Sequence, residues 1–444
     1  MPTPATASQT EAAAGQWPDC VELGEWTKVP FPLPGSLSLK LKKVDQAAHA
    51  AIKKTGVLTF HTVGCTGCHA DQLATGWVAA AMAVQVDHPH RFGGTEAAVA
   101  PAFLYHLGDL VYKKDKETAG EQSPDPPPEK RHDFAQLYNT QFYAPYATYA
   151  PAVFALAGNH DGKDRDPGGP ARKSAIHHFL KNFCGLDDGD PSDKQSSGRL
   201  PMTQPYPYWL LETPLAYVVG LYTNVNNAGL FDDPQGPAQP QFDWLVQTLR
   251  DIKAAADGKA VLLALHYPPY SAAANFAERG DPNLGPTPRP AGKSLEPLGV
   301  LLQRAFRNSG QLPDAVFSAH AHLYQRLTYT DASGRHIPYL IAGAGGHAPV
   351  EKLSKPCLRD AGVTPTGTPP QVVYPPGLTL PAGDKVELAA FNDQNFGFLR
   401  ITVDGNRHTL TGEYFTVSTA PTTAKTPATL ADSFTLDLRT HSVR

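Results

Sequence analysis

Seven short runs of apolar residues recur between about residues 57 and 346 of the chain, and most of them end in glycine followed by a polar residue. The runs are rich in β-branched and aromatic residues and are too short for helices, so they predict β-strands. Because apolar residues fill each run instead of alternating with polar ones, we expect both faces of each strand to be buried. The runs are VLTFHTVG, AFLYHLGD, AVFALAGNHD, AYVVGLYTNV, KAVLLALHYPP, DAVFSAHAH and PYLIAGAGG.

Longer segments with a helical pattern lie between several of these runs. They are WVAAAMAVQV, HDFAQLYNTQFYAPY, SAIHHFLKNF, QFDWLVQTLRDIKAAA and PLGVLLQRAFRNS, and residues 38–54 add a short strand and a helix. Strands that alternate with helices predict the α/β class. We therefore predict one domain of two packed sheets flanked by helices, with ligand-binding residues where the strands run out into loops.

The two ends of the chain differ from this pattern. Residues 1 to about 35 are rich in Ala, Thr and Pro, which predicts an extended arm. Near the other end, FGFLRITVDGNRHTLTGEYFTV contains two alternating segments around Asp404-Gly405. Asp-Gly between alternating segments is a strong signal for a β-hairpin. Polar segments rich in Pro and Gly at 113–130 and 271–293 predict surface loops that rim the site.

Composition narrows the class of protein. The chain has 444 residues, of which 41% are hydrophobic, enough for a sizeable core. Its net charge of -4 gives no basic footprint for nucleic acid and does not favour an anionic membrane. No stretch approaches the ~18–20 apolar residues of a membrane span, and the N-terminus lacks the basic and apolar regions of a signal peptide. We expect a cytoplasmic protein, with export after loss of a leader as the alternative.

Four of the predicted strands end in residues that commonly bind metal ions. The fragments are Gly108-Asp109-Leu-Val-Tyr112, Gly158-Asn159-His160-Asp161, Leu265-His266 and Ala319-His320-Ala321-His322. Carboxylate and amide oxygens, imidazole nitrogens and a phenolate suit Zn, Mn and Fe. Each fragment alone is weak, because Gly-Asp is often only a turn and a histidine after a strand is often structural. The ordered set is the specific signal.

This ordered set resembles the calcineurin-like metallophosphoesterases, and it is most similar to their purple acid phosphatase branch because of the Gly-Asp-x-x-Tyr form. The resemblance runs from about Val57 to Val403. It implies a four-layer α/β/β/α sandwich of two mixed sheets flanked by helices. The phosphoesterase domain would cover 57–403, after an arm and leading helix at 1–56 and before C-terminal strands at 404–444 that pack on the same domain.

The resemblance also implies a metal-dependent phosphatase that acts on a small phosphorylated substrate and binds one or two ions of Fe, Zn or Mn. Asp109 would bridge the two metals, since a carboxylate can join ions ~3.5–4 Å apart and such a pair clamps the oxygens of a phosphoryl transfer. One metal would be completed by Asn159, His266 and His320, and the other by Tyr112 and His322. A hydroxide made acidic by the metals would attack phosphorus.

Two neighbouring residues would act on the substrate in this scheme. His160 would face the scissile phosphate, as an acid for the leaving oxygen or as a stabiliser of its charge. Asp161 would orient His160. Asn159 and His160 would contact the substrate phosphate. The sequence does not indicate the oligomeric state.

The first strand departs from the family pattern. The family has an aspartate after the glycine that ends this strand, whereas here Gly64 is followed by Cys65. A thiolate binds Zn or Fe but is softer than a carboxylate, so the site would be retuned, half-occupied or lost. The other interpretation makes Cys65 a buried structural residue beside a single remaining metal. Ala319 also replaces a family glycine, which the turn tolerates if its φ is negative.

The same segment allows other interpretations. Cys65-Thr-Gly-Cys68-His69 matches the attachment motif of c-type haem, and a redox Cys-x-x-Cys pair, a 65–68 disulfide or extra metal ligands are further alternatives. Three functions therefore stay open. The first is an active metal-dependent phosphoesterase, the second a degenerate relative that binds metal or phosphate without turnover, and the third a redox or haem protein. We favour the active enzyme, because only one ligand position departs from the pattern.

Overall fold

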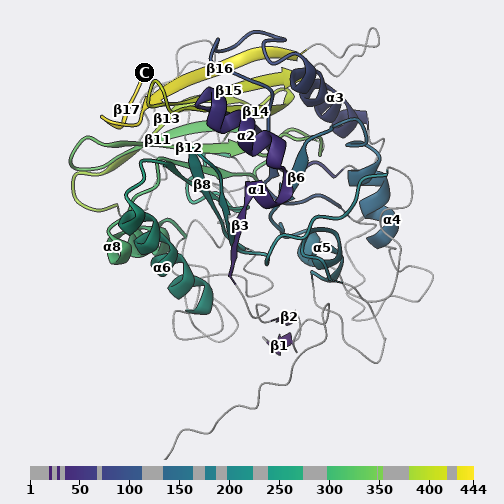
Figure 1. Cartoon of the computed structure of the whole chain (residues 1–444), viewed down its shortest axis with the longest axis horizontal. Coiled ribbons are helices and arrows are strands. Elements are labelled where there is room, and N and C mark those ends of the chain that lie inside the picture. The colour runs from purple at the N-terminus through teal and green to yellow at the C-terminus, as the bar shows by residue number, and fades with distance from the viewer. Residues whose placement is uncertain are drawn as a thin grey trace, which may run out of the picture.

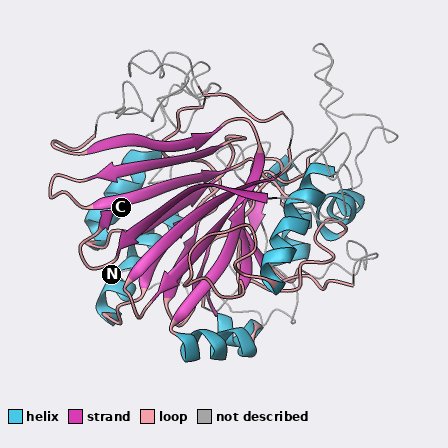
Figure 2. Ribbon diagram, turned by 90° about the horizontal axis from the view of Figure 1, so that it is seen from above, coloured by secondary structure: helices cyan, strands magenta, loops and turns pink. Residues whose placement is uncertain are grey.

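The computed structural model describes twelve stretches of the chain, and in them two mixed β-sheets pack face to face with helices on their outer sides (Figure 1 and Figure 2). This arrangement confirms the predicted α/β/β/α sandwich. The described residues are 20–22, 28–30, 36–67, 73–112, 134–163, 176–186, 198–223, 239–273, 298–347, 349–353, 380–417 and 428–444.

One sheet has seven strands in the order β17-β16-β15-β14-β4-β5-β6. Strands β4, β5 and β6 are parallel, and the others pair antiparallel. The predicted hairpin is confirmed, since β14 and β15 pair in register from Asp404 opposite Thr409. The strands are β4 (Val57–Val63), β5 (Phe103–His106), β6 (Ala152–Ala155), β14 (Phe396–Asp404), β15 (Thr409–Val417), β16 (Ala428–Asp437) and β17 (Ser442–Val443).

The other sheet has eight strands in the order β13-β11-β12-β10-β9-β8-β7-β3. Its central strands β8, β9, β10 and β12 are parallel. Two strands of the predicted arm, β1 (Cys20–Glu22) and β2 (Lys28–Pro30), form a separate antiparallel pair. The eight strands are β3 (Ser38–Lys40), β7 (Trp209–Glu212), β8 (Ala216–Gly220), β9 (Ala260–Ala264), β10 (Ala315–Ser318), β11 (Tyr324–Thr330), β12 (His336–Ala342) and β13 (Lys385–Asn392).

The helices form the two outer layers. On the eight-stranded sheet lie α6 (Gln239–Ala255) and α8 (Leu298–Ser309), which contact each other. The seven-stranded sheet is covered by α3 (Leu73–Asp87), α4 (Phe134–Tyr138) with the π-helical turn η2 (Asn139–Tyr143), and α5 (His177–Phe183). The short helices are α1 (Leu41–Val44), α2 (Gln46–Thr55) and the 3₁₀ turn η3 (Asp161–Lys163). Among the described helices, none combines the length and the apolar character needed to span a bilayer.

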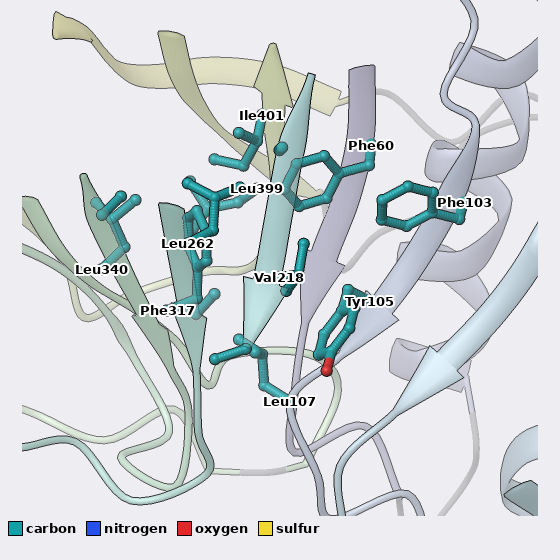
Figure 3. Packing of buried hydrophobic residues seen from close by; sticks show 14 of the residues in the cluster. Phe60, Phe103, Tyr105, Leu107, Val218, Leu262, Phe317, Leu340, Leu399 and Ile401 are labelled. Carbon is teal, nitrogen blue, oxygen red and sulfur yellow. The ribbon is translucent and has the colours of Figure 1, made fainter. Parts of the chain in front are cut away.

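Strands in the middle of the sandwich are buried on both faces, as their continuous apolar runs predict. In β9, Leu262 points toward the opposite sheet while Val261 and Leu263 pack against the α6/α8 layer. Between the sheets, the rings of Phe60 from β4 and Phe317 from β10 meet edge to face at 6.1 Å between centroids (Figure 3). Residues of both sheets therefore pack together in one central core. This packing sets the positions of the strand ends of the two sheets relative to each other.

Polar contacts also join the two sheets near the C-terminal strands. Arg326 of β11 donates two hydrogen bonds, of 2.8 and 3.0 Å, to the carboxylate of Asp432 in β16. The Tyr324 hydroxyl donates to the same carboxylate at 2.7 Å, and its ring stacks on Tyr414 of β15 with 3.9 Å between centroids. These contacts hold the C-terminal strands against the edge of the other sheet.

A buried ion pair lies on β14 and β15. Arg400 and Glu413 are almost completely buried, and Arg400 Nε donates to Glu413 Oε2 at 2.9 Å. The other guanidinium nitrogens donate to the backbone carbonyls of Pro89 and Gly93. Glu413 in turn accepts a hydrogen bond from the backbone N–H of Thr95. The pair thus anchors the segment after α3 onto the sheet and satisfies charges that burial would otherwise penalise.

Candidate metal centre and active site

The predicted site residues gather at one edge of the sandwich, where strands of both sheets end. The loops after β4, β5 and β6 come from one sheet, and those after β9, β10 and β12 come from the other. Hydrogen bonds join the two halves. Gly64 N donates to Ala342 O at 2.9 Å, and His266 Nδ1 lies 2.7 Å from Leu107 O. The carboxyl ends of parallel strands in both sheets therefore form one site.

Three of the site residues have an unusual backbone conformation. Cys65, Asp109 and His320 have φ of 54°, 58° and 63°, in the left-handed region that residues other than glycine rarely adopt. Each lies two or three residues after the end of a strand, and neighbouring loops hold the turns in place. For example, Cys65 N donates to Gly108 O at 2.9 Å, and Ala319 N donates to His266 O at 2.9 Å. Such conformations cost on the order of 1–3 kcal/mol each and cluster at functional sites.

Cys65, Asp109 and His266 form a group that fits a metal ion. Their ligand atoms all lie within 4.8 Å of one another, and all three side chains are buried. Asp109 Oδ2 lies 3.4 Å from His266 Nε2. A thiol sulfur, a carboxylate oxygen and an imidazole nitrogen are ligands of zinc and iron. The chemistry of this donor set therefore fits the metal that the sequence predicts.

Asn159 and His320 extend this group. Asn159 Oδ1 lies 3.1 Å from His266 Nε2 and 2.9 Å from His320 Nδ1. The predicted ligands of one metal thus converge around the amide oxygen of Asn159 and adjoin Asp109. The structure brings these residues together, and their role as ligands stays a prediction.

Tyr112 and His322 form a second group next to Asp109. The Tyr112 hydroxyl donates to Asp109 Oδ2 at 2.9 Å and lies 3.2 Å from His322 Nε2. Asp109 therefore contacts a residue of each predicted ligand group, which is the position that a bridging carboxylate requires. Burial lowers the pKa of His322 to about 3, helped by His347 and His320, so its imidazole is neutral and available to a metal.

Burial and neighbouring charges shift the pKa values of Asp109 and Cys65 in opposite directions. Burial disfavours the charged carboxylate of Asp109, but nearby His266 and His160 outweigh burial and hold its pKa well below the usual value. Burial, with Asp109 beside it, raises the pKa of the Cys65 thiol well above its usual value. Cys65 is thus a neutral thiol in this environment, and binding as a thiolate requires a cation that displaces its proton.

His160 and Asp161 have different surroundings. The backbone N–H of His160 donates to Asp109 Oδ1 at 2.8 Å, and its half-buried ring lies 4.2 Å from the ring of Tyr112. Asp161 accepts from the backbone N–H groups of Asp109 and Gly158, each at 2.8 Å. Burial, with Asp109 nearby, raises the pKa of Asp161 to about 7. These contacts show that Asp161 joins two site loops; that it also orients the His160 ring stays a prediction.

The sequence analysis missed two residues of this site. His347 follows β12 after the segment Gly343-Ala344-Gly345-Gly346, and its ring stacks on Tyr112 with 3.7 Å between centroids. Glu351 accepts from His322 N at 3.2 Å and donates its own N–H to His322 O at 2.8 Å. PYLIAGAGG followed by His347 has the same strand, glycine and polar residue pattern as the other site strands, so a signal existed. We find no such signal for Glu351.

The departures from the family pattern have physical accounts. Cys65 is a buried free thiol and accepts a hydrogen bond from His320 N at 3.2 Å. Ala319 is not among the described residues with positive φ, so its methyl is tolerated as predicted. A side chain on Gly64 would lie 2.5 Å from that methyl, so the two strand ends pack tightly. The rest of the Cys-x-x-Cys-His motif, Cys68 and His69, lies outside the described residues.

Gly158→Ala is expected to lower the rate of the metal-dependent hydrolysis that the sequence predicts about 100-fold. A methyl group at this position would overlap Asp109 Oδ1 and lie 2.5 Å from Asp109 N, so the carboxylate must move. A displacement of about 1 Å in a catalytic group costs on the order of 10²-fold in rate. The measurement is kcat/KM, with thermal melting as the test of folding. Gly76→Ala in α3 is the matched control because its methyl has open space; equal activities of the two variants would contradict the prediction.

Comparison with known proteins identifies the family of the chain. The family model for calcineurin-like phosphoesterases (Metallophos) matches residues 86–324, which is more than half of the chain. The chain belongs to the calcineurin-like phosphoesterase family, and the resemblance seen in its motifs is confirmed at that level. Family membership supports metal-dependent hydrolysis of phosphoesters in general. A search of curated proteins found no matching sequence.

Two solved structures are similar in overall shape. One is described as the structure of PhoD, with 12% sequence identity, a TM-score of 0.46, and coverage of 87% of this chain and 71% of that chain. The other is described as GAP50, the anchor in the inner membrane complex of Plasmodium, with 10% identity, a TM-score of 0.45, and coverage of 85% and 89%.

Proposed function

We propose that this protein is a metal-dependent phosphatase that hydrolyses the phosphate ester of a small molecule. One observation carries the proposal: the buried Asp109 carboxylate contacts both sets of ligand-type side chains. His266 Nε2 and the Tyr112 hydroxyl both contact Asp109 Oδ2. Family membership supports the reaction class, and the half-buried His160 beside this group supports a phosphate-binding position next to it.

The site residues would have separate roles in metal binding and in the reaction. Asp109, Asn159, His266 and His320 would hold one ion, and Asp109 with Tyr112 and His322 would hold the other. Bound metal would supply an activated water as nucleophile and positive charge against the phosphoryl oxygens. His160 would donate a hydrogen bond or proton toward the leaving oxygen, because its ring lies beside the cluster and not within it.

Metal identity depends on Cys65 and Tyr112. We propose that Cys65 takes the place of the family carboxylate as a ligand, since its sulfur belongs to the group that fits a metal. A thiolate favours zinc or iron over manganese. Tyr112 supports the more specific proposal of a purple acid phosphatase-like centre with ferric iron, because a phenolate suits that ion.

Hydrolysis of p-nitrophenyl phosphate, with and without added Zn, Mn or Fe, tests this function. We expect turnover that depends on added metal, is lost with a chelator, and greatly exceeds that of His320→Ala prepared in the same way. Bis(p-nitrophenyl) phosphate, measured in parallel, separates a monoesterase from a diesterase. Turnover of both substrates no better than His320→Ala under every metal would favour the second candidate, a protein that binds metal or phosphate without hydrolysis. The replacement of the family carboxylate by Cys65 is the observation that favours that candidate.

A further inference from the structure

His347 lies at the accessible side of the metal-binding group without being part of it. Its ring stacks on Tyr112 at 12° between planes and lies 4.7 Å from the ring of His322. Cys65, Asp109 and Tyr112 are fully buried, whereas His347 is half-buried, as His160, His320 and His322 are. A substrate must enter from the exposed side, where it would meet these imidazoles. His320 and His322 are predicted metal ligands, so His160 and His347 are the two that remain for contact with the substrate.

The orientation of His347 is fixed by the backbone. Its N–H donates to Cys65 O at 3.1 Å, and its Nδ1 lies 3.0 Å from Gly67 O, which can only accept a hydrogen bond. Nδ1 therefore carries the proton in that bond. Nε2 faces a substrate as a lone-pair acceptor in the neutral ring and as an N–H donor in the imidazolium, which is the form that would bind a phosphate oxygen. An imidazole held through one nitrogen by a carbonyl is typical of histidines that use the other nitrogen for function.

We propose that His347 is a substrate-positioning residue that contacts a phosphate oxygen of the substrate together with His160. The two rings both lie against Tyr112, with 6.4 Å between their centroids. One phosphate group placed between the two rings can contact both of them, because two hydrogen bonds of about 2.8 Å each cover a separation of this size. The inference rests on the proposed phosphatase function and assigns to it a residue outside the predicted ligand set.

Binding of inorganic phosphate, measured by titration calorimetry on the zinc-loaded full-length protein, tests this proposal without turnover. We compare the unchanged protein with His347→Ala, His347→Phe and His347→Gln. The Phe ring keeps the stacking on Tyr112 but cannot donate a hydrogen bond, whereas the Gln amide can. We expect phosphate binding to weaken about tenfold or more in the Ala and Phe variants, the effect of losing one hydrogen bond to a charged group, and to be largely restored by Gln. Zinc content should be unchanged in all variants.

The outcomes separate the possible roles of His347. Phosphate binding by His347→Phe equal to that of the unchanged protein would overturn the proposal, because stacking alone would then explain the residue. Loss of zinc in all three variants would also overturn it and make His347 a ligand. Absence of phosphate binding by the unchanged protein would also overturn the proposal. A protein that binds phosphate through His347 but hydrolyses nothing would support this proposal and refute the proposed function.

Discussion

Asp109→Asn is expected to abolish hydrolysis, with a loss of about 10³-fold or more in kcat, and to release metal from the protein. The carboxylate contacts both ligand groups, through His266 at 3.4 Å and Tyr112 at 2.9 Å. An amide of the same size removes the negative charge and one metal-binding oxygen. Since bound metal supplies several kcal/mol of transition-state stabilisation, its loss corresponds to about three powers of ten in rate. The measurements are kcat with p-nitrophenyl phosphate and metal content after gel filtration.

Asp251→Asn is the matched control for this substitution. Asp251 is an exposed residue of α6 on the outer helical layer, so its replacement should leave both activity and metal content unchanged. Retention of metal and of more than a tenth of the activity by Asp109→Asn would exclude Asp109 as the bridging ligand. Loss of activity with full retention of metal would instead restrict its role to the reaction.

Arg400→Met is expected to destabilise the protein by about 3–5 kcal/mol. The substitution leaves the Glu413 carboxylate buried without its ion-pair partner and removes the hydrogen bonds to Pro89 O and Gly93 O. Breaking a buried ion pair from one side costs about this much, because the remaining charge stays uncompensated. The measurement is the free energy of unfolding in urea, followed by both fluorescence and circular dichroism so that two-state behaviour is tested.

The same sheet provides a control for the Arg400 substitution. Arg407 lies 3.7 Å from Asp404, but 63% of its side chain is exposed. Arg407→Met should therefore cost no more than about 1 kcal/mol, as for other exposed ion pairs. Similar losses in the two variants would show that burial of the Arg400 pair contributes little. The double substitution of Arg400 and Glu413 by apolar residues should recover part of the loss, since no unpaired charge then remains.

The sequence predicted the strands that are themselves continuous apolar runs. It missed strands whose polar residues are stabilised by partners far away in the sequence. Each continuous apolar run became a strand of the sandwich. By contrast, β11 reads YQRLTYT, and its polar residues gave no strand signal. Arg326 of this strand is tolerated there because Asp432, more than a hundred residues away, accepts its hydrogen bonds. Only the packed sheets show that partnership.

The candidate site divides in the same way. Asp109, Asn159, His266, His320 and His322 were predicted from short motifs at strand ends, and the structure brings them together. What each of them does stays a prediction. His347 follows a strand and glycines as other site residues do, but its contact with Tyr112 depends on how the loop after β12 of one sheet meets the loop after β5 of the other. The contacts of Asp161 with backbone amides were missed for a related reason, since a motif does not show which loop a carboxylate joins.

Because the two halves of the site come from different sheets, neither sheet alone can hold a metal ion with the full set of side chains. Partly folded chains in which only one sheet has formed would therefore be inactive, and activity appears only with the completed sandwich. An ion bound between the strand ends would also link side chains of the two sheets to each other. It would favour the closed arrangement over the unfolded chain by an amount that grows with metal concentration. Metal supply would then govern how long the folded protein survives as well as how fast it works.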